Sequence, residues 1–175
     1  MTIIVGGLRD RLVHQSLCKE IERVLTALGW LGTTSLTHPV NLIFEPVDSK
    51  ADVPLNTVAI VALDQDGEDA EIGSNLQRKR WSYAIDVYGA SESLSVHLAG
   101  DISACLVGQV GAVGRLASTI EVRNWTVPTH DLLFLADVEE VHTDRAEDPS
   151  VLWRRYWRSI GFYLEWTETA DGVDP

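Results

Sequence analysis

The sequence predicts an α+β domain, with a mostly antiparallel β-sheet, two α-helices packed on one face and a long C-terminal β-hairpin. Two stretches show the three- and four-residue apolar spacing of amphipathic helices. Several others show the alternating or continuous apolar character of strands. The 175 residues fit one domain, so we expect residues 1–175 to fold as a single unit.

The first predicted helix runs from Leu8 to Leu28. Its apolar residues recur at steps of three and four and form one stripe: Val13, Leu17, Ile21, Val24 and Leu28. Gly29 is a suitable C-terminal cap, because glycine accepts the left-handed backbone conformation found there.

Two short strands are expected next. Val40–Phe44 reads as a strand that ends before Pro46. Thr57–Leu63 is almost continuously apolar, as in a central strand covered on both faces. The polar stretch Asp64–Lys79 has no period and is predicted to be a loop.

The middle of the chain combines a strand and a second helix. Arg80–Tyr88 alternates apolar and polar residues, which predicts a half-buried strand. Ser91 is a good N-cap for the helix that follows. Its apolar face is formed by Leu94, Leu98, Ile102, Cys105 and Leu106. Gly100 inside this helix predicts a close approach of another backbone.

After a glycine-spaced loop at Gly108–Gly114, three more strands are predicted at Thr119–Trp125, Leu132–Val141 and Trp153–Thr167. The turn Ala146–Pro149 would join the last two as a long antiparallel hairpin. Residues 170–175 are expected to be a disordered acidic tail.

Composition restricts the classes of function. The content of 45% hydrophobic and 23% charged residues is that of a folded domain. The net charge of −12 argues against a surface that grips nucleic acid, since phosphate binding needs clustered Lys and Arg. An acidic wall would instead repel a passing phosphate backbone. Six Trp residues favour cores and subunit interfaces.

The location is predicted to be cytoplasmic at synthesis. Met1–Val5 lacks the basic region and cleavage motif of a signal peptide. Apolar runs are all shorter than the roughly 20 residues of a membrane helix. Cys18 and Cys105 have no C-x-x-C spacing and are expected to be buried, reduced thiols.

Catalytic and metal-binding motifs are weak, so we expect no enzyme activity, no metal and no cofactor. The histidines lack the spacing of a helical zinc site. Gly89–Ser93 resembles the nucleophile elbow of hydrolases, but its last residue is serine where glycine is needed, and Ser91 is explained as a helix cap. A calcium site is the other alternative, in the acidic run that contains Asp64, Asp66, Glu68, Asp69 and Glu71. The simpler interpretation of that run is a solvated acidic loop.

Two basic spots stand out in this acidic chain, one at Arg78–Arg80 and one at Arg154, Arg155 and Arg158. They are suited to pair with acidic patches on a neighbouring copy, which would set the docking register. Solvated charges flanking strands are an equally good interpretation.

The order of several short motifs resembles the tail terminator (tail completion) proteins of long-tailed, siphovirus-type bacteriophages, in particular those of actinobacteria. The resemblance runs from about residue 9 to residue 167, and its motifs are Arg9–Val13, Leu28–Trp30, Glu45–Asp48, Val53–Thr57, Glu71–Leu76, Trp81, Asp86–Tyr88, His97–Ile102, Trp153 and Tyr156–Trp157. The stretch Gly108–Ile120 is more glycine-rich than the family pattern.

This resemblance implies a structural virion protein, made in the host cytoplasm, that forms a homohexameric ring at the head-proximal end of the tail tube. Such a ring stops tube polymerisation and joins the tail to the connector or stopper protein of the head, and genomic DNA passes through it without specific binding. No membrane is involved. The residues we expect at the subunit or tube interface are Arg78, Arg80, Trp153, Arg154, Arg155, Tyr156 and Trp157. The acidic run Asp64–Glu71 is expected to face the channel or the connector.

Three alternatives stay open. Another head–tail joining protein, such as a stopper or an adaptor, would share the same setting. A calcium-binding or hydrolytic protein would use the acidic run or Ser91. An interaction module of a host cell is the third. For the aromatic residues of the expected interface, completion of the monomer's own core is an equally good interpretation.

Overall fold

A computed structural model describes residues 6–32, 40–44, 56–69, 76–108, 119–145 and 156–169 of this chain. The elements, in chain order, are α1 (Gly6–Ala27), β1 (Asn41–Ile43), β2 (Thr57–Asp69), β3 (Leu76–Tyr88), α2 (Glu92–Leu106), β4 (Thr119–Arg123), β5 (Leu132–Arg145) and β6 (Trp157–Thr169). The six strands form one sheet in the order β1-β2-β3-β6-β5-β4, antiparallel except for β1 with β2. The predicted α+β class is confirmed.

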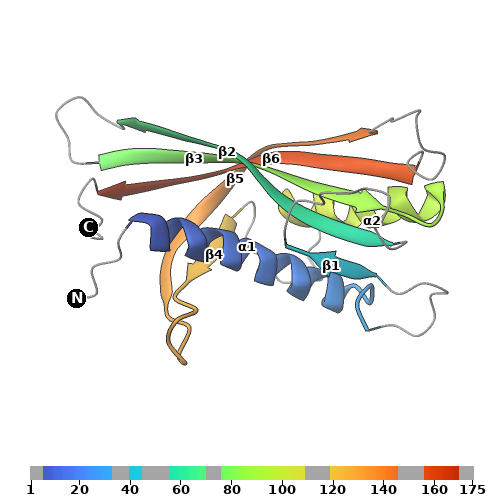
Figure 1. Cartoon of the computed structure of the whole chain (residues 1–175), viewed down its shortest axis with the longest axis horizontal. Coiled ribbons are helices and arrows are strands. Elements are labelled where there is room, and N and C mark those ends of the chain that lie inside the picture. The colour runs from blue at the N-terminus through green and yellow to red at the C-terminus, as the bar shows by residue number, and fades with distance from the viewer. Residues whose placement is uncertain are drawn as a thin grey trace.

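Both helices pack on the same face of this sheet, and Figure 1 shows α1 running beneath the strands. Directly opposed residues of β3 and β6 point into this layer, with Tyr83 against Phe162 and Ile85 against Ile160. The apolar stripe of α1 meets them; among its residues, Leu17 and Ile21 are fully buried. We call the opposite side of the sheet the helix-free face, since no described helix covers it.

The two helices are also joined at their ends. Gly29 has a positive φ of 79° and ends α1, as its sequence position predicted. The indole Nε1 of Trp30 then donates a hydrogen bond of 2.8 Å to the carboxylate of Asp101 on α2. Ser91 accepts a hydrogen bond from the Leu94 amide, so its predicted role as the N-cap of α2 is confirmed.

The prediction of a loop over Asp64–Lys79 is wrong for residues 64–69 and 76–79, and residues 70–75 lie outside the described residues. Strand β2 continues to Asp69 and β3 begins at Leu76, with a bulge between Ala62 and Asp64. In this distal part of the hairpin the backbone register sets Asp66 opposite Arg80 and Glu68 opposite Arg78. Residues of opposite charge in register favour strand pairing without the apolar alternation on which the prediction relied. Glu71 lies outside the described residues.

The close backbone approach predicted at Gly100 is also wrong. A Cβ built on this residue would meet no described atom within 4 Å, and Gly100 is exposed. The space beside it belongs to a groove described below. The glycine therefore leaves room next to α2 instead of admitting a neighbouring strand.

The C-terminal pairing of β5 with β6 is confirmed, although β5 is bent. A bulge lies between Glu139 and His142, and Glu140 adopts a positive φ of 52°. Strand β5 pairs with β6 from Asp137 onward, whereas residues 132–137 pair with β4. The β4–β5 hairpin thereby leaves the plane of the sheet and lies against α1 (Figure 1). The turn at 146–149, residues 109–118 and the tail 170–175 lie outside the described residues.

Arg9 of α1 lies where β5 separates from β6. Its guanidinium carbon is 4.6 Å from the ring centroid of Phe134, and that ring is 6.1 Å from Trp166 of β6. Arg9 is only 3% exposed, so its stem and planar head fill space between the two strands.

Cys18 and Cys105 are both buried, reduced thiols, as predicted. In the part of the chain that the structure describes, neither helix combines the length and apolar character needed to cross a lipid bilayer.

Candidate functional site

The residues predicted to form one interface are divided between two ends of the sheet. Arg80 is in register with Glu165, whereas Trp157 is in register with Tyr88 at the far end of β3. The rings of Trp157 and Tyr88 stack at 5.7 Å, and the carbonyl of Tyr156 accepts a hydrogen bond from Gly89. The Trp157 ring and the Tyr156 backbone therefore make contacts within the monomer. Trp153, Arg154 and Arg155 lie outside the described residues.

Arg78 and Arg80 belong to an ion-pair network on the helix-free face. Arg78 pairs with Glu165 of β6, and Arg80 reaches across β6 to Glu140 of β5 at 2.7 Å. The Arg80 guanidinium also lies 3.9 Å from the ring centroid of Tyr163. The bulge in β5 presents Glu140 for this contact. Because exposed pairs contribute only about 0–1 kcal/mol each, the network orders this surface more than it stabilises the fold.

A shallow groove of about 280 Å³ lies on the same face. His142 covers Gly161 at its floor, where a Cβ would come within 2.4 Å of the imidazole ring. The Nδ1 atom of His142 is 3.1 Å from the Glu140 carbonyl, and its Nε2 atom is 3.7 Å from Asp144. The ring nitrogens thus face these oxygen atoms rather than the serines of the groove, Ser82 and Ser159. Leu63, which is 60% exposed, forms part of the rim.

The features behind the hydrolase and calcium alternatives have structural roles. Ser91 acts as the N-cap of α2. The backbone from Asp64 to Asp69 is an extended strand, not the irregular loop that the calcium site required. Over the described residues, no group of three or more His, Cys, Asp and Glu side chains is placed to hold a metal ion.

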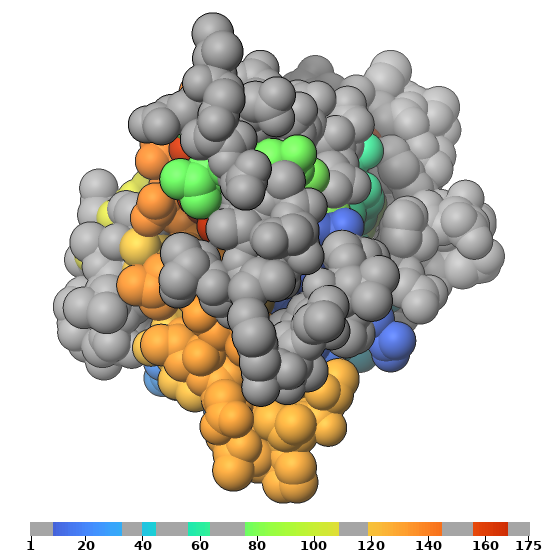
Figure 2. All heavy atoms as spheres, turned by 90° about the vertical axis from the view of Figure 1, so that its left-hand side faces the viewer, coloured from blue at the N-terminus to red at the C-terminus, as the bar shows by residue number. Residues whose placement is uncertain are grey.

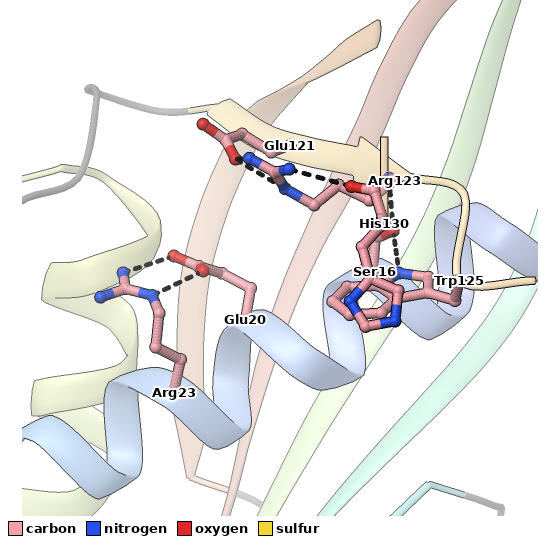
Figure 3. Close-up of polar contacts among 7 residues, drawn as sticks. All are labelled: Ser16, Glu20, Arg23, Glu121, Arg123, Trp125 and His130. Atoms are coloured by element: carbon pink, nitrogen blue, oxygen red, sulfur yellow. Dashed lines mark hydrogen bonds and ion pairs between the residues drawn. The ribbon is translucent and has the colours of Figure 1, made fainter. Parts of the chain in front are cut away.

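The β4–β5 hairpin is anchored to α1 by Ser16, which is 2% exposed (Figure 3). Its hydroxyl accepts hydrogen bonds from the backbone N–H of Arg123 at 3.0 Å and from the indole of Trp125 at 2.9 Å. The Arg123 side chain pairs with Glu121 and donates to the carbonyl of His130 at 3.0 Å. One buried hydroxyl and one arginine therefore fix the base of the hairpin.

We define the hairpin tip as residues 124–132. The Trp125 and His130 rings lie 4.7 Å apart, and the Asn124 side chain accepts hydrogen bonds from the backbone and hydroxyl of Thr126. Four consecutive residues at its end, 128–131, are exposed, and Leu132 is 51% exposed. Figure 2 shows this hairpin, in orange, projecting from the bottom of the molecule. The tip is thus an ordered, protruding element.

A second groove, of about 470 Å³, runs between α2 and strands β5 and β6. We call it the α2 groove; it is lined by Val96, Ala99, Gly100, Ser103, Ala104, Val107, Thr143 and Arg158. The Arg158 side chain is 18% exposed, and its Nε atom is buried without a hydrogen-bond acceptor. The carboxylate of Glu92 is 3.7 Å from the Arg158 Nη2 atom, which is longer than a hydrogen bond. A buried donor without an acceptor costs about 1–3 kcal/mol.

A polar cluster between α1 and the sheet was not predicted from the sequence. His14 stacks on Tyr83 with ring centroids 5.9 Å apart, and its Nε2 atom lies 3.6 Å from the Cys18 thiol. Burial raises the pKa of Cys18 to about 12 and also raises the pKa of Tyr83. Both groups therefore stay protonated at neutral pH, and Cys18 is no thiolate nucleophile. The four-residue spacing of His14 and Cys18 was the available sequence signal.

Comparison with models of known protein families and with curated proteins finds no match to this chain.

Proposed function

We propose that this chain is a tail terminator: a virion protein that forms a ring at the head-proximal end of a phage tail tube, stops its growth and joins it to the head. The proposal comes from the order of sequence motifs over residues 9–167. The structural observation that best supports it is the one-sided sheet. Both helices cover one face, and the distal part of the other face presents long strands to solvent.

A one-sided sheet suits a subunit that meets other subunits. Leu63 and Leu135, which is 46% exposed, lie beside charged residues on the helix-free face. Apolar side chains interspersed with arginine and aromatic residues are typical of interfaces. Arg80 and Tyr163 supply that combination. The net charge of −12 fits a ring through which DNA moves without sticking.

Electron microscopy of the purified protein, alone and mixed with tail tubes, tests the proposal. We expect rings that cap one end of each tube. A protein that stays monomeric and leaves tube ends bare would refute it. Rings that bind the head connector but not the tube would instead identify a stopper or an adaptor.

The acidic run is proposed to face the channel or the connector. Its backbone lies in β2 next to basic residues of β3. The test replaces Asp64, Asp66, Glu68, Asp69 and Glu71 by their amides. Slower DNA delivery from otherwise normal particles is expected, and unchanged delivery would contradict the placement.

A further inference from the structure

We infer that the hairpin tip of one copy inserts into the α2 groove of a neighbouring copy, with Asp131 facing Arg158 and Leu132 against the small residues of α2. This inference rests on the proposed function, because it names the contact that would build the ring. Four observations support it. The tip is an ordered structure, and the groove has room for a side chain. The two surfaces carry complementary charges, and they lie at different places on the molecule.

The hairpin tip is organised before it meets a partner. Ser16 and Arg123 fix its base, and the hydrogen bond from the Asn124 amide to the Asp131 carbonyl, 2.8 Å, closes the loop. A rigid tip loses little conformational freedom on docking, which favours binding. Leu132 is one of the large apolar side chains that the monomer leaves more than half exposed.

The α2 groove has room for such a side chain. Gly100 and two alanines are small residues and leave space along this side of α2. A Cβ on Gly100 would meet no described atom within 4 Å. Val96, at 43% exposure, and Val107 provide apolar walls. A leucine fits this combination of small floor and apolar wall better than a second bulky side chain would.

The charges of the two surfaces are complementary. The Arg158 guanidinium lines the groove with a buried Nε that has no acceptor, and its contact with Glu92 is too long for a hydrogen bond. An incoming carboxylate would form a charge-assisted hydrogen bond with the exposed part of the guanidinium. Asp131 is exposed at the tip, directly before Leu132. Arg78 and Arg80, by contrast, already have carboxylate partners on the helix-free face.

The tip and the groove occupy different places on the molecule. In Figure 1 the β4–β5 hairpin extends below the sheet toward the lower left, whereas α2 lies toward the right. A contact between two such separated patches is suited to head-to-tail association, and repeated head-to-tail contacts close into rings or extend into filaments. A reciprocal exchange of the two contacts would instead give a two-fold dimer, which the particle mass measured below distinguishes from a ring.

Charge reversal tests the pairing. Asp131→Arg and Arg158→Glu, each alone, are expected to weaken self-association at least about tenfold, and the double variant is expected to restore it. The readout is particle mass by light scattering over a range of concentrations. Glu22→Arg and Arg11→Glu, positions on α1 outside both surfaces and outside the helix-free face, are the matched controls and are expected to assemble normally.

A variant that fills the groove distinguishes an effect on assembly from an effect on folding. Gly100→Leu occupies the space that we assign to Leu132, and leucine is the better helix former. We expect a raised thermal midpoint together with lost self-association. Normal assembly of Gly100→Leu, or of both charge reversals, in a protein whose wild type forms rings would overturn the inference and leave the proposed function intact. A wild type that neither self-associates nor binds tubes would overturn the proposed function as well.

Discussion

The two faces of the sheet differ in how they are held. The helix-covered face is apolar: Tyr83, Phe162 and Ile160 belong to one buried cluster with residues of both helices, and their burial drives folding. The distal helix-free face is held by ion pairs among long side chains, such as Arg80 with Glu140. The free energy of folding therefore comes mainly from the helix-covered face, and under the proposed function the helix-free face is the one available for contacts with partners.

The largest expected loss of stability comes from a substitution on the helix-covered face. Phe162→Ala removes a ring that is 1% exposed and stacks on Tyr83 at 5.8 Å. A loss of about 3–5 kcal/mol is expected from the free energy of unfolding. Urea denaturation followed by tryptophan fluorescence measures it. A loss below about 1 kcal/mol would show that this face does not dominate stability.

The next largest loss of stability is expected at the residue that anchors the β4–β5 hairpin. Ser16→Ala removes the acceptor of two donors, the Arg123 amide and the Trp125 indole. Leaving them without a partner is expected to cost about 1–3 kcal/mol. Amide hydrogen exchange at Arg123 should rise well above that in β3 and β6. Ser103→Ala on α2 is the matched control, and equal exchange in both variants would contradict the anchoring role.

The buried thiol of Cys18 makes the free energy of unfolding depend on pH. Because the pKa of Cys18 is raised to about 12 from 9.0, the folded state retains a proton that the unfolded chain loses. The stability from this group is complete below pH 9 and falls as the pH rises toward 12. Cys18→Ala should flatten that slope in unfolding experiments between about pH 8 and about pH 10.5. An unchanged slope would mean that another group, with Tyr83 the first candidate, causes it.

The smallest effect is expected on the helix-free face. A double-mutant cycle of Arg80→Ala and Glu140→Ala should give a coupling of at most about 1 kcal/mol, and salt should weaken it. A coupling above about 2 kcal/mol would remove the contrast between the two faces.

The same contrast explains which elements could be predicted from the sequence. Apolar periodicity marked α1, α2 and the central strands, because those residues pack on the covered face. The distal part of the β2–β3 hairpin was missed because its sequence is charged, with Asp66 opposite Arg80 in the backbone register. Charged residues hide the alternation that marks a strand.

The candidate site was less predictable than the fold. Arg78 and Arg80 were identified as basic spots, but their partners Glu165 and Glu140 come from strands distant in the sequence. Gly100 has no side chain and does mark a space beside α2, but no described neighbouring strand fills that space. The role of Ser16 depends on contact between a helix and a hairpin that lie far apart in the sequence, which no local pattern reveals.

The mass of the particle that this protein forms, alone and with tail-tube protein, tests the central claim most directly. A closed ring of six copies that also binds tube ends is the predicted result. A monomer at every concentration, with no affinity for tubes, would contradict it.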